Sequence, residues 1–169
     1  MESRGFQYEE AEASFELLVR RNRPGYRPPF ELEDFMVVER RSHSRGEQEQ
    51  PRATREMISE AMVKVRVKGE GVHTAAEGNG PVNALDAAVR KALLQFYPSL
   101  EVVKLVDYKV RIIDTGAGTA AFVRVTVESS DGEQNWTTVG SSTDIIEASW
   151  LALADSLEYW LARQEWSVR

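Results

Sequence analysis

The residues of this sequence best suited to hold a ligand lie in two turns, each placed ahead of an amphipathic segment. The first turn is Gly78-Asn79-Gly80-Pro81, and the second is Gly140-Ser141-Ser142-Thr143-Asp144. Pro81 suits the first position of a helix, and glycine permits both φ > 0 and a close backbone approach. Both turns are therefore predicted to open a helix and to present backbone N–H groups to a small anion such as a carboxylate.

The other residues contain no recognisable catalytic or metal-binding motif. The histidines, His43 and His73, have no second ligand at a recognisable metal spacing, and the sequence contains no cysteine. No Gly-x-Ser-x-Gly motif occurs, so Ser141 and Ser142 are interpreted as turn or capping residues. The glycine pattern at 78–80 lacks the third glycine of a dinucleotide site and the lysine of a P-loop. We expect no catalytic residue, no metal and no cofactor, and the sequence favours binding over catalysis.

The composition is that of a soluble globular protein. The chain has 169 residues, 42% hydrophobic and 28% charged, which is enough for one domain with a sizeable core. The net charge of −6 argues against nucleic acid, because no basic patch compensates for it. No apolar run reaches membrane-spanning length, and the first residues are not those of a signal peptide. The lack of cysteine fits the cytoplasm, where we expect the protein.

A helix is predicted near the start of the chain, over residues 8–21. Ala11, Phe15 and Leu18 recur there at helical spacing, and the acidic start and basic end suit the helix dipole. A proline-rich break follows at 23–29. The pattern alone leaves two interpretations open: the tail of a preceding domain, or an N-terminal helix packed on the domain itself.

The rest of the chain divides into similar halves. Strands are predicted over 30–40, 59–68 and 72–77, and a helix over about 82–96. The polar run at 41–54 is expected to be a flexible loop. The core stripe of this helix is Val82, Leu85, Val89, Ala92 and Phe96. The helix after the second turn has the stripe Ile146, Ser149, Leu153, Leu157 and Trp160.

Three segments of the second half echo the first. Leu105–Val110 echoes Leu32–Val37, Ala121–Val127 echoes Ala61–Val67, and Glu147-Ala148-Ser149 matches Asp86-Ala87-Ala88. Two βββα units, about 30–98 and about 99–169, are the simplest explanation. We therefore predict an α+β fold with an internal pseudo-repeat, in which one helix covers one face of each antiparallel three-stranded sheet. The other sheet face needs cover from within the chain, from a second chain across a two-fold interface, or from both, which we favour.

Several motifs, in one order, resemble a known family. Glu77–Ala88 resembles the first βα turn of the C-terminal regulatory domain of 2-isopropylmalate synthase and citramalate synthase. Leu105–Arg111, Trp136–Gly140 and Asp144–Trp150 resemble the citramalate synthase branch. The resemblance covers roughly Phe30 to Leu161. It implies that residues 1–29, the helix and proline-rich linker, are the tail of a preceding linker subdomain, and that residues 30–169 are the regulatory domain.

The resemblance also implies a function. In this family the domain is an obligate dimer that binds the end-product amino acid near the dimer interface, isoleucine for citramalate synthase and leucine for isopropylmalate synthase. Binding lowers the activity of a distant metal-binding barrel, which joins acetyl-CoA to pyruvate or to 2-oxoisovalerate. That barrel and its His-x-His ligands have no counterpart in this sequence, so the chain is interpreted as a regulatory fragment that is not itself an enzyme.

The family's binding residues can be carried over position by position. The pocket for the branched side chain would consist of Leu105, Tyr108, Ile112, Thr119 and Val123. The carboxylate and ammonium group of the effector would meet the helix-opening turns at Gly80, Pro81, Ser142, Thr143 and Asp144. The strand pattern alone would instead make Leu105, Ile112 and Val123 plain core.

Four hypotheses follow. The first is an amino-acid-binding regulatory domain of citramalate synthase. Its effector is expected to be isoleucine on the branch-specific motifs, although leucine differs from isoleucine by one methyl position, worth about 1–3 kcal/mol. A leucine-sensing domain of isopropylmalate synthase is the second. The third is a dimerisation module that binds no ligand. The two glycine turns and Tyr108 are evidence against it. A small enzyme is the fourth, disfavoured because no nucleophile, base or metal set is apparent.

Overall fold

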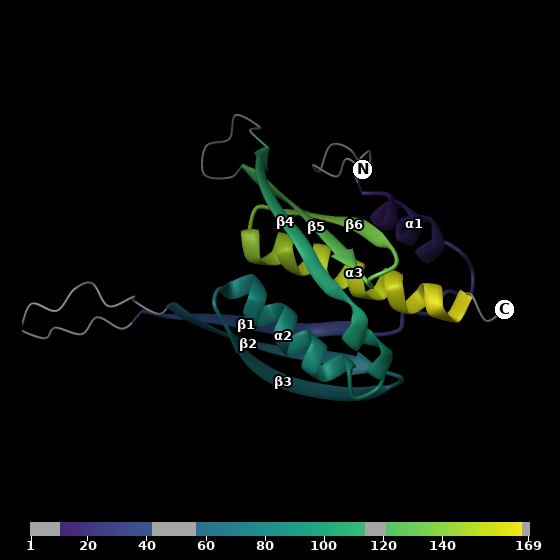
Figure 1. Cartoon of the computed structure of the whole chain (residues 1–169), viewed down its shortest axis with the longest axis horizontal. Helices are drawn as coiled ribbons and strands as arrows, with labels where there is room; N and C mark the ends of the chain where they lie inside the picture. Colours follow the sequence, from purple (N-terminus) through teal and green to yellow (C-terminus); the bar gives the residue numbers. More distant parts are fainter. Residues whose placement is uncertain (1–10, 42–56, 114–120, 167–169) are drawn as a thin grey trace, which may run out of the picture. The chain divides into compact units, whose positions relative to one another are not determined.

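The computed structural model describes residues 11–41, 57–113 and 121–166. The chain forms two compact units, here called the first and the second unit (Figure 1). The first unit spans residues 31–96, and the second consists of residues 97–169 together with residues 1–30. Most of the loop predicted at 41–54 lies outside the described residues.

The first unit is a three-stranded antiparallel sheet covered by one helix. Its strands are β1 (Glu31–Arg41), β2 (Met57–Val67) and β3 (Glu70–Gly78), in the order β1-β2-β3, and α2 (Pro81–Leu93) follows them. Alternate residues of β2, such as Val63 and Val65, are buried, while Lys64 between them is exposed. This alternation gives the sheet one apolar face, on which α2 packs its own buried stripe.

The second unit repeats this architecture. A short 3₁₀ turn, η2 (Pro98–Val102), leads into the strands β4 (Lys104–Ile113), β5 (Phe122–Ser130) and β6 (Asn135–Ser142), and α3 (Ile145–Trp166) follows. The strand order is β4-β5-β6, all antiparallel. Figure 1 shows α3 (yellow-green) lying along this sheet. The predicted α+β fold of two βββα units is therefore confirmed.

The register of the two sheets confirms one of the three predicted echoes. Phe35 pairs with Val63 and Tyr108 pairs with Val127, and the ladder shifts after Leu32 in β1 as it does after Leu105 in β4. The segments Leu32–Val37 and Leu105–Val110 are thus equivalent, including the irregularity in each.

The other two echoes were aligned wrongly. Val63 corresponds to Val127 and not to Val123. Val63 lies opposite Phe35, and Val127 lies opposite Tyr108, which is the residue equivalent to Phe35. Thr74 donates a 2.7 Å hydrogen bond to the carbonyl of Ala88, and Thr138 donates one of the same length to Ala152. Ala88 therefore corresponds to Ala152, not to Ser149. Strand and helix patterns look the same after a shift by one period, so periodicity alone could not fix these alignments.

The second predicted turn is shorter than expected. Strand β6 continues to Ser142, so Gly140 and Ser141 lie in the strand and not in the turn. A Cβ at Gly140 would lie 2.0 Å from the carbonyl oxygen of Ala148, so glycine here allows α3 to approach β6. A Cβ at Gly78 would lie 2.5 Å from the backbone nitrogen of Ala84, and Gly78 has no positive φ. Close backbone approach, not φ > 0, explains both glycines.

Helix α1 (Glu12–Arg21) packs on the second unit, against α3 and β6. The start predicted at residue 8 lies outside the described residues. The hydroxyl of Ser14 accepts a 2.9 Å hydrogen bond from the N–H of Val139 on β6, and it donates to Asp155 on α3 at 3.1 Å. Arg21 donates to Asp155 at 2.7 Å and to Glu158 at 3.1 Å. The assignment of residues 1–29 to a preceding subdomain stays a prediction.

Candidate ligand-binding site

Three of the predicted pocket residues lie on one face of the second sheet. Tyr108 and Ile112 project from the same side of β4, because their partners Val127 and Val123 occupy the same side of β5. Val123 in turn pairs with Ser142, at the end of β6 and next to the start of α3. Since Val127 is fully buried beneath α3, this is the helix-covered face of the sheet. The structure thus brings Tyr108, Ile112, Val123 and Ser142 together.

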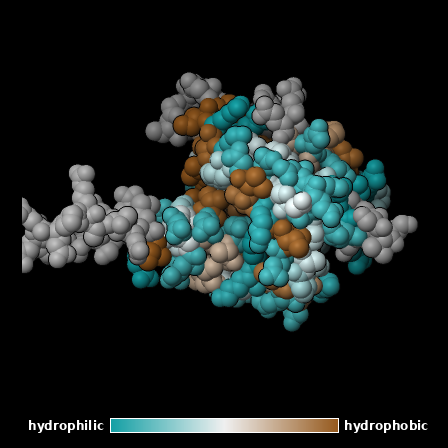
Figure 2. Space-filling model, viewed as in Figure 1, coloured by the Kyte–Doolittle hydropathy of each residue, from teal (hydrophilic) through white to brown (hydrophobic). Residues whose placement is uncertain are grey.

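This apolar strip, defined here as Tyr108, Val110, Ile112 and Val123, becomes more exposed along β4. Tyr108 is half-buried, Val110 is 39% exposed and Ile112 is 74% exposed. Figure 2 shows hydrophobic side chains gathered along β4 on the surface. An exposed apolar surface on a sheet face typically marks a binding or interaction site.

Leu105 reaches the same face as Tyr108 in spite of an odd spacing. Leu105 lies opposite Ser129, and the register then shifts so that Asp107 lies opposite Glu128 on the other face. The bulge at Val106 therefore keeps Leu105 and Tyr108 on one side of the sheet. Leu105 is half-buried. Thr119 lies outside the described residues.

The start of α3 is already capped by its own side chains. Oδ1 of Asp144 accepts hydrogen bonds from the N–H groups of Ile146, at 2.7 Å, and Glu147, at 3.0 Å. The hydroxyl of Ser142 accepts from the N–H of Asp144 at 3.1 Å and donates to the Glu147 carboxylate. Thr143, between them, is exposed. These N–H groups are thus not available to a carboxylate, and the charge of Asp144 suits an ammonium group instead.

The start of α2 has no such cap. Gly80 is the N-cap residue, makes no side-chain capping bond, and is followed by Pro81 at the first helical position. Oδ1 of Asn83 accepts only from the N–H of Asn79, at 3.3 Å. The positive end of this helix can therefore attract a carboxylate more readily than that of α3. Gly80 and Pro81 belong to the first unit, whereas the apolar strip belongs to the second, so their joint action stays a prediction.

Tyr108 is held by a residue to which sequence analysis assigned no ligand role. Its hydroxyl lies 2.8 Å from Oγ of Ser149 on α3, and Ser149 donates at 2.6 Å to the carbonyl of Ile145. Ser149 is completely buried. The signal was present in the sequence, since Ser149 is the polar member of an otherwise apolar helical stripe, and a buried hydroxyl requires a partner.

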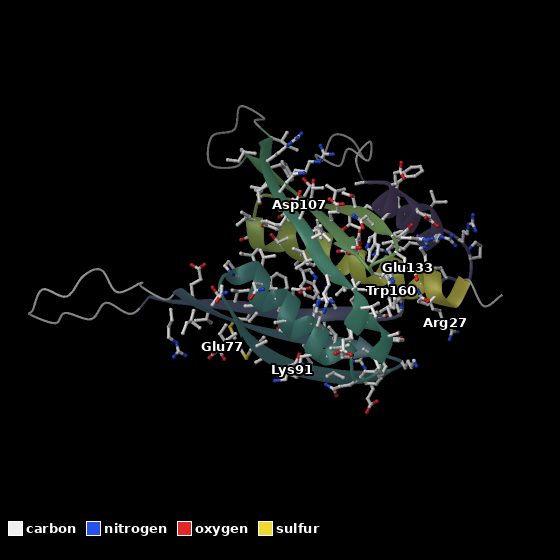
Figure 3. All side chains as sticks on the ribbon, viewed as in Figure 1. Arg27, Glu77, Lys91, Asp107, Glu133 and Trp160 are labelled. Carbon is white, nitrogen blue, oxygen red and sulfur yellow. The ribbon has the colours of Figure 1, made fainter. Side chains whose placement is uncertain are left out.

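The opposite face of the same sheet carries a polar hollow of about 140 Å³. It is lined by Asp107, Lys109, Arg111, Arg124, Thr126, Glu128 and Thr137. Asp107 (labelled in Figure 3) pairs with Lys109 at 2.8 Å, and the hydrogen bonds from Lys109 and from the Tyr108 N–H lower the pKa of its carboxyl group. Such a lining suits polar groups and does not suit a branched apolar side chain.

The described residues form neither a metal site nor a membrane-spanning helix. No three His, Asp or Glu side chains within this part of the chain lie together in a way that could hold a metal ion. Among its helices, none is long and apolar enough to cross a bilayer.

Comparison with known sequences places the chain. Residues 9–161 match the family described as the LeuA allosteric (dimerisation) domain. The chain belongs to this family. The predicted resemblance to the regulatory domain of the citramalate synthase and 2-isopropylmalate synthase family is thereby confirmed.

The individual relatives of this chain include citramalate and 2-isopropylmalate synthases. An (R)-citramalate synthase of Geobacter sulfurreducens is 52% identical over 98% of this chain and 30% of that protein. An (R)-citramalate synthase of Aquifex aeolicus is 46% identical over the same shares, 98% and 30%. A 2-isopropylmalate synthase of Aquifex aeolicus is 29% identical over 100% of this chain and 32% of that protein. The chain thus spans about 30% of the length of these curated relatives.

Proposed function

We propose that this LeuA domain is the feedback-regulatory part of an (R)-citramalate synthase. It binds the end product isoleucine and thereby lowers the condensation of acetyl-CoA with pyruvate in isoleucine biosynthesis. The identities of 52% and 46% to citramalate synthases, against 29% to a 2-isopropylmalate synthase, support this branch. In this proposal the condensation belongs to a barrel outside the present sequence, and the chain itself contributes no catalytic residue.

The apolar strip is the observation that carries the proposal. It offers β-branched and aromatic side chains to solvent on a face that is elsewhere covered by a helix, and it ends beside the capped start of α3. An isoleucine side chain on Ile112 and Val123 removes apolar surface from water on both partners, worth about 1.5–3 kcal/mol for a full side chain. Its ammonium group then meets the carboxylate of Asp144. Leu105 extends the pocket on the same face, and the family resemblance adds Thr119 to the residues of the site.

The carboxylate of the effector is assigned to the uncapped start of α2, at Gly80 and Pro81. In the proposal this contact is made within a homodimer, in which a second copy covers the strip, as the dimerisation function of the family suggests. A ligand that bridges two elements in this way stabilises the arrangement it binds, which is how it can act on a distant catalytic site. We place this activity in the cytoplasm, consistent with the absence of cysteine.

Titration calorimetry of the chain with isoleucine, leucine and valine in parallel tests the proposal. The tightest binding is expected for isoleucine. Tighter binding of leucine would assign the chain to the 2-isopropylmalate synthase branch. No heat with any of the three, together with an unchanged melting temperature, would leave a dimerisation module without an effector.

A further inference from the structure

The direction of the hydrogen bonds around Ser149 follows from their chemistry. A serine hydroxyl has one proton, and a backbone carbonyl can only accept. Because Ser149 lies 2.6 Å from the carbonyl oxygen of Ile145, its proton is directed there. At the 2.8 Å contact with Tyr108, Ser149 must therefore accept, and the phenol O–H of Tyr108 donates. The phenol proton thus points into the interior, toward α3.

This bond fixes the Tyr108 ring at the boundary between covered and exposed parts of the sheet. On one side lies Val127, fully buried beneath α3, and on the other lie Val110 and Ile112, which are increasingly exposed. A phenol that lost its acceptor there would have to turn its hydroxyl toward water, because an unsatisfied buried O–H is costly. The ring would then swing across the face on which Ile112 and Val123 lie.

We infer that Ser149 is a positioning residue of the amino-acid site: its hydroxyl oxygen holds the Tyr108 ring and so sets the shape that a branched side chain must match. The inference rests on the proposed function and deepens it. Ser149 touches no ligand itself, since it is completely buried, and it acts only through Tyr108. A specificity difference as small as one methyl position requires a ring held in one place.

The same helix supplies a matched control. Ser156 lies about two turns after Ser149 on the same face of α3, and it too is buried. It accepts from the indole N–H of Trp136 at 2.9 Å and donates to Ser129 at 2.7 Å. Its loss removes a buried hydroxyl of the same kind, but one under the covered end of the sheet. An effect on stability alone is expected of Ser156→Ala.

Calorimetric titration with isoleucine and with leucine is carried out on the unsubstituted chain and on S149A, Y108F, the S149A/Y108F double variant and S156A. Loss of one neutral hydrogen bond predicts an isoleucine Kd raised about three- to ten-fold in S149A and in Y108F. The double variant should lose no more than either single variant, because both remove the same bond. The ratio of leucine to isoleucine Kd should move toward one in these three variants and stay unchanged in S156A.

Several outcomes overturn the inference. The first is an isoleucine Kd for S149A within about two-fold of that of the unsubstituted chain. The second is a double variant whose Kd increase equals the product of the increases in the two single variants. An equal loss in S156A would reduce Ser149 to a general packing role. If S149A does not fold, Y108F decides, since it removes the donor without opening a cavity in the core. No heat from the unsubstituted chain with any amino acid would overturn the proposed function as well, which separates the two failures.

Discussion

Ile112 of β4 lies directly opposite Val123 of β5 on the helix-covered face of the second sheet, yet Ile112 is 74% exposed. The reason is that α3 packs on β5 and β6, whereas β4 is an edge strand of the sheet. On β4 the same face is therefore closed at Tyr108, which contacts Ser149 of α3, and open at Ile112. A strand pattern gives no sign of which strands a helix covers, so alternation made these residues look like core.

Replacing Ile112 with alanine should weaken isoleucine binding about ten-fold, because it removes the apolar surface on which the effector side chain rests. The fold itself should persist, with an unchanged circular dichroism spectrum, since the side chain is mostly exposed within the chain. Calorimetry measures the affinity, and circular dichroism checks the fold. Ile58→Ala, a 45% exposed isoleucine of β2, is the control and should alter neither. An unchanged affinity of the Ile112 variant for isoleucine would show that the apolar strip does not bind the effector.

The chain is expected to be a dimer at micromolar concentration, because a second copy is the expected cover for the exposed strip. Light scattering over a range of protein concentrations measures the mass directly. A monomer mass that does not depend on concentration would contradict the homodimer.

Arg21→Ala should destabilise the second unit. It leaves Glu158, whose side chain is 7% exposed, and Asp155 without their cation, whereas Tyr26 would still donate to Glu158 at 2.7 Å. Breaking a buried pair costs about 3–5 kcal/mol, and the partial exposure of Arg21 reduces this to about 1–3 kcal/mol. The neighbouring Arg20→Ala, which removes a half-buried helical pair with Glu16 at a spacing of four residues, should cost less, about 0.5 kcal/mol. Urea unfolding of the two variants makes the comparison, and equal losses would refute it.

Asp131 should make stability depend on pH in the acid range. Its carboxyl group accepts from the N–H groups of Gln134 and Glu133 and from the indole N–H of Trp160, and these bonds lower its pKa in the folded state, Gln134 contributing most (Figure 3 labels Glu133 and Trp160). A carboxyl group with a lowered folded pKa contributes stability that is fully present above its unfolded pKa and is lost as the pH falls through its folded pKa.

Asp131→Asn should therefore be less stable than the unsubstituted chain at pH 7, and the difference should shrink as the pH is lowered below about 4. Unfolding free energies measured between pH 7 and pH 2 give the two curves. Glu133→Gln is the control, because it keeps the backbone N–H that donates to Asp131, and it should be as stable as the unsubstituted chain at pH 7. Parallel curves for Asp131→Asn and the unsubstituted chain would contradict the assignment.

Gly140→Ala should cost about 3 kcal/mol or more, because its Cβ would clash with the backbone of Ala148 and not with a movable side chain. Gly71→Ala on β3 is the control, since a Cβ there meets nothing within 4 Å. Thermal melting of both variants tests this. A small loss at Gly140 would mean that α3 can retreat from β6 at little cost.

The elements were predictable because their causes are local. The alternation of Val63, Lys64 and Val65 marks a strand with one wet face, and Pro81 marks the first residue of α2. The residue-by-residue alignment of the two units was predicted wrongly. A stretch of alternating valines looks the same when moved by two or four residues. The strand registers and the hydrogen bonds of Thr74 and Thr138 were needed to show which residues of the two units correspond.

The candidate site was predictable only in part, and the missing parts are long-range. The resemblance to the family selected Tyr108, Ile112 and Val123, but nothing in the sequence shows that Ser149 accepts from Tyr108. The cap at Asp144 could be read locally, yet its consequence, that the N–H groups of α3 are occupied, required the side-chain geometry. Contacts between residues far apart in the chain leave no periodic signal.

The bond from the Val139 N–H to Ser14 has a consequence for how the second unit behaves when its N-terminal helix is removed. β6 is an edge strand, and α1 lies against it and occupies that N–H group. A chain shortened to begin at residue 30 would present this edge to solvent, as a template on which a strand from another molecule can pair. Helix α1 thus covers an edge that could otherwise pair with another chain. A protein shortened at the proline-rich segment should therefore polymerise more readily than the full chain.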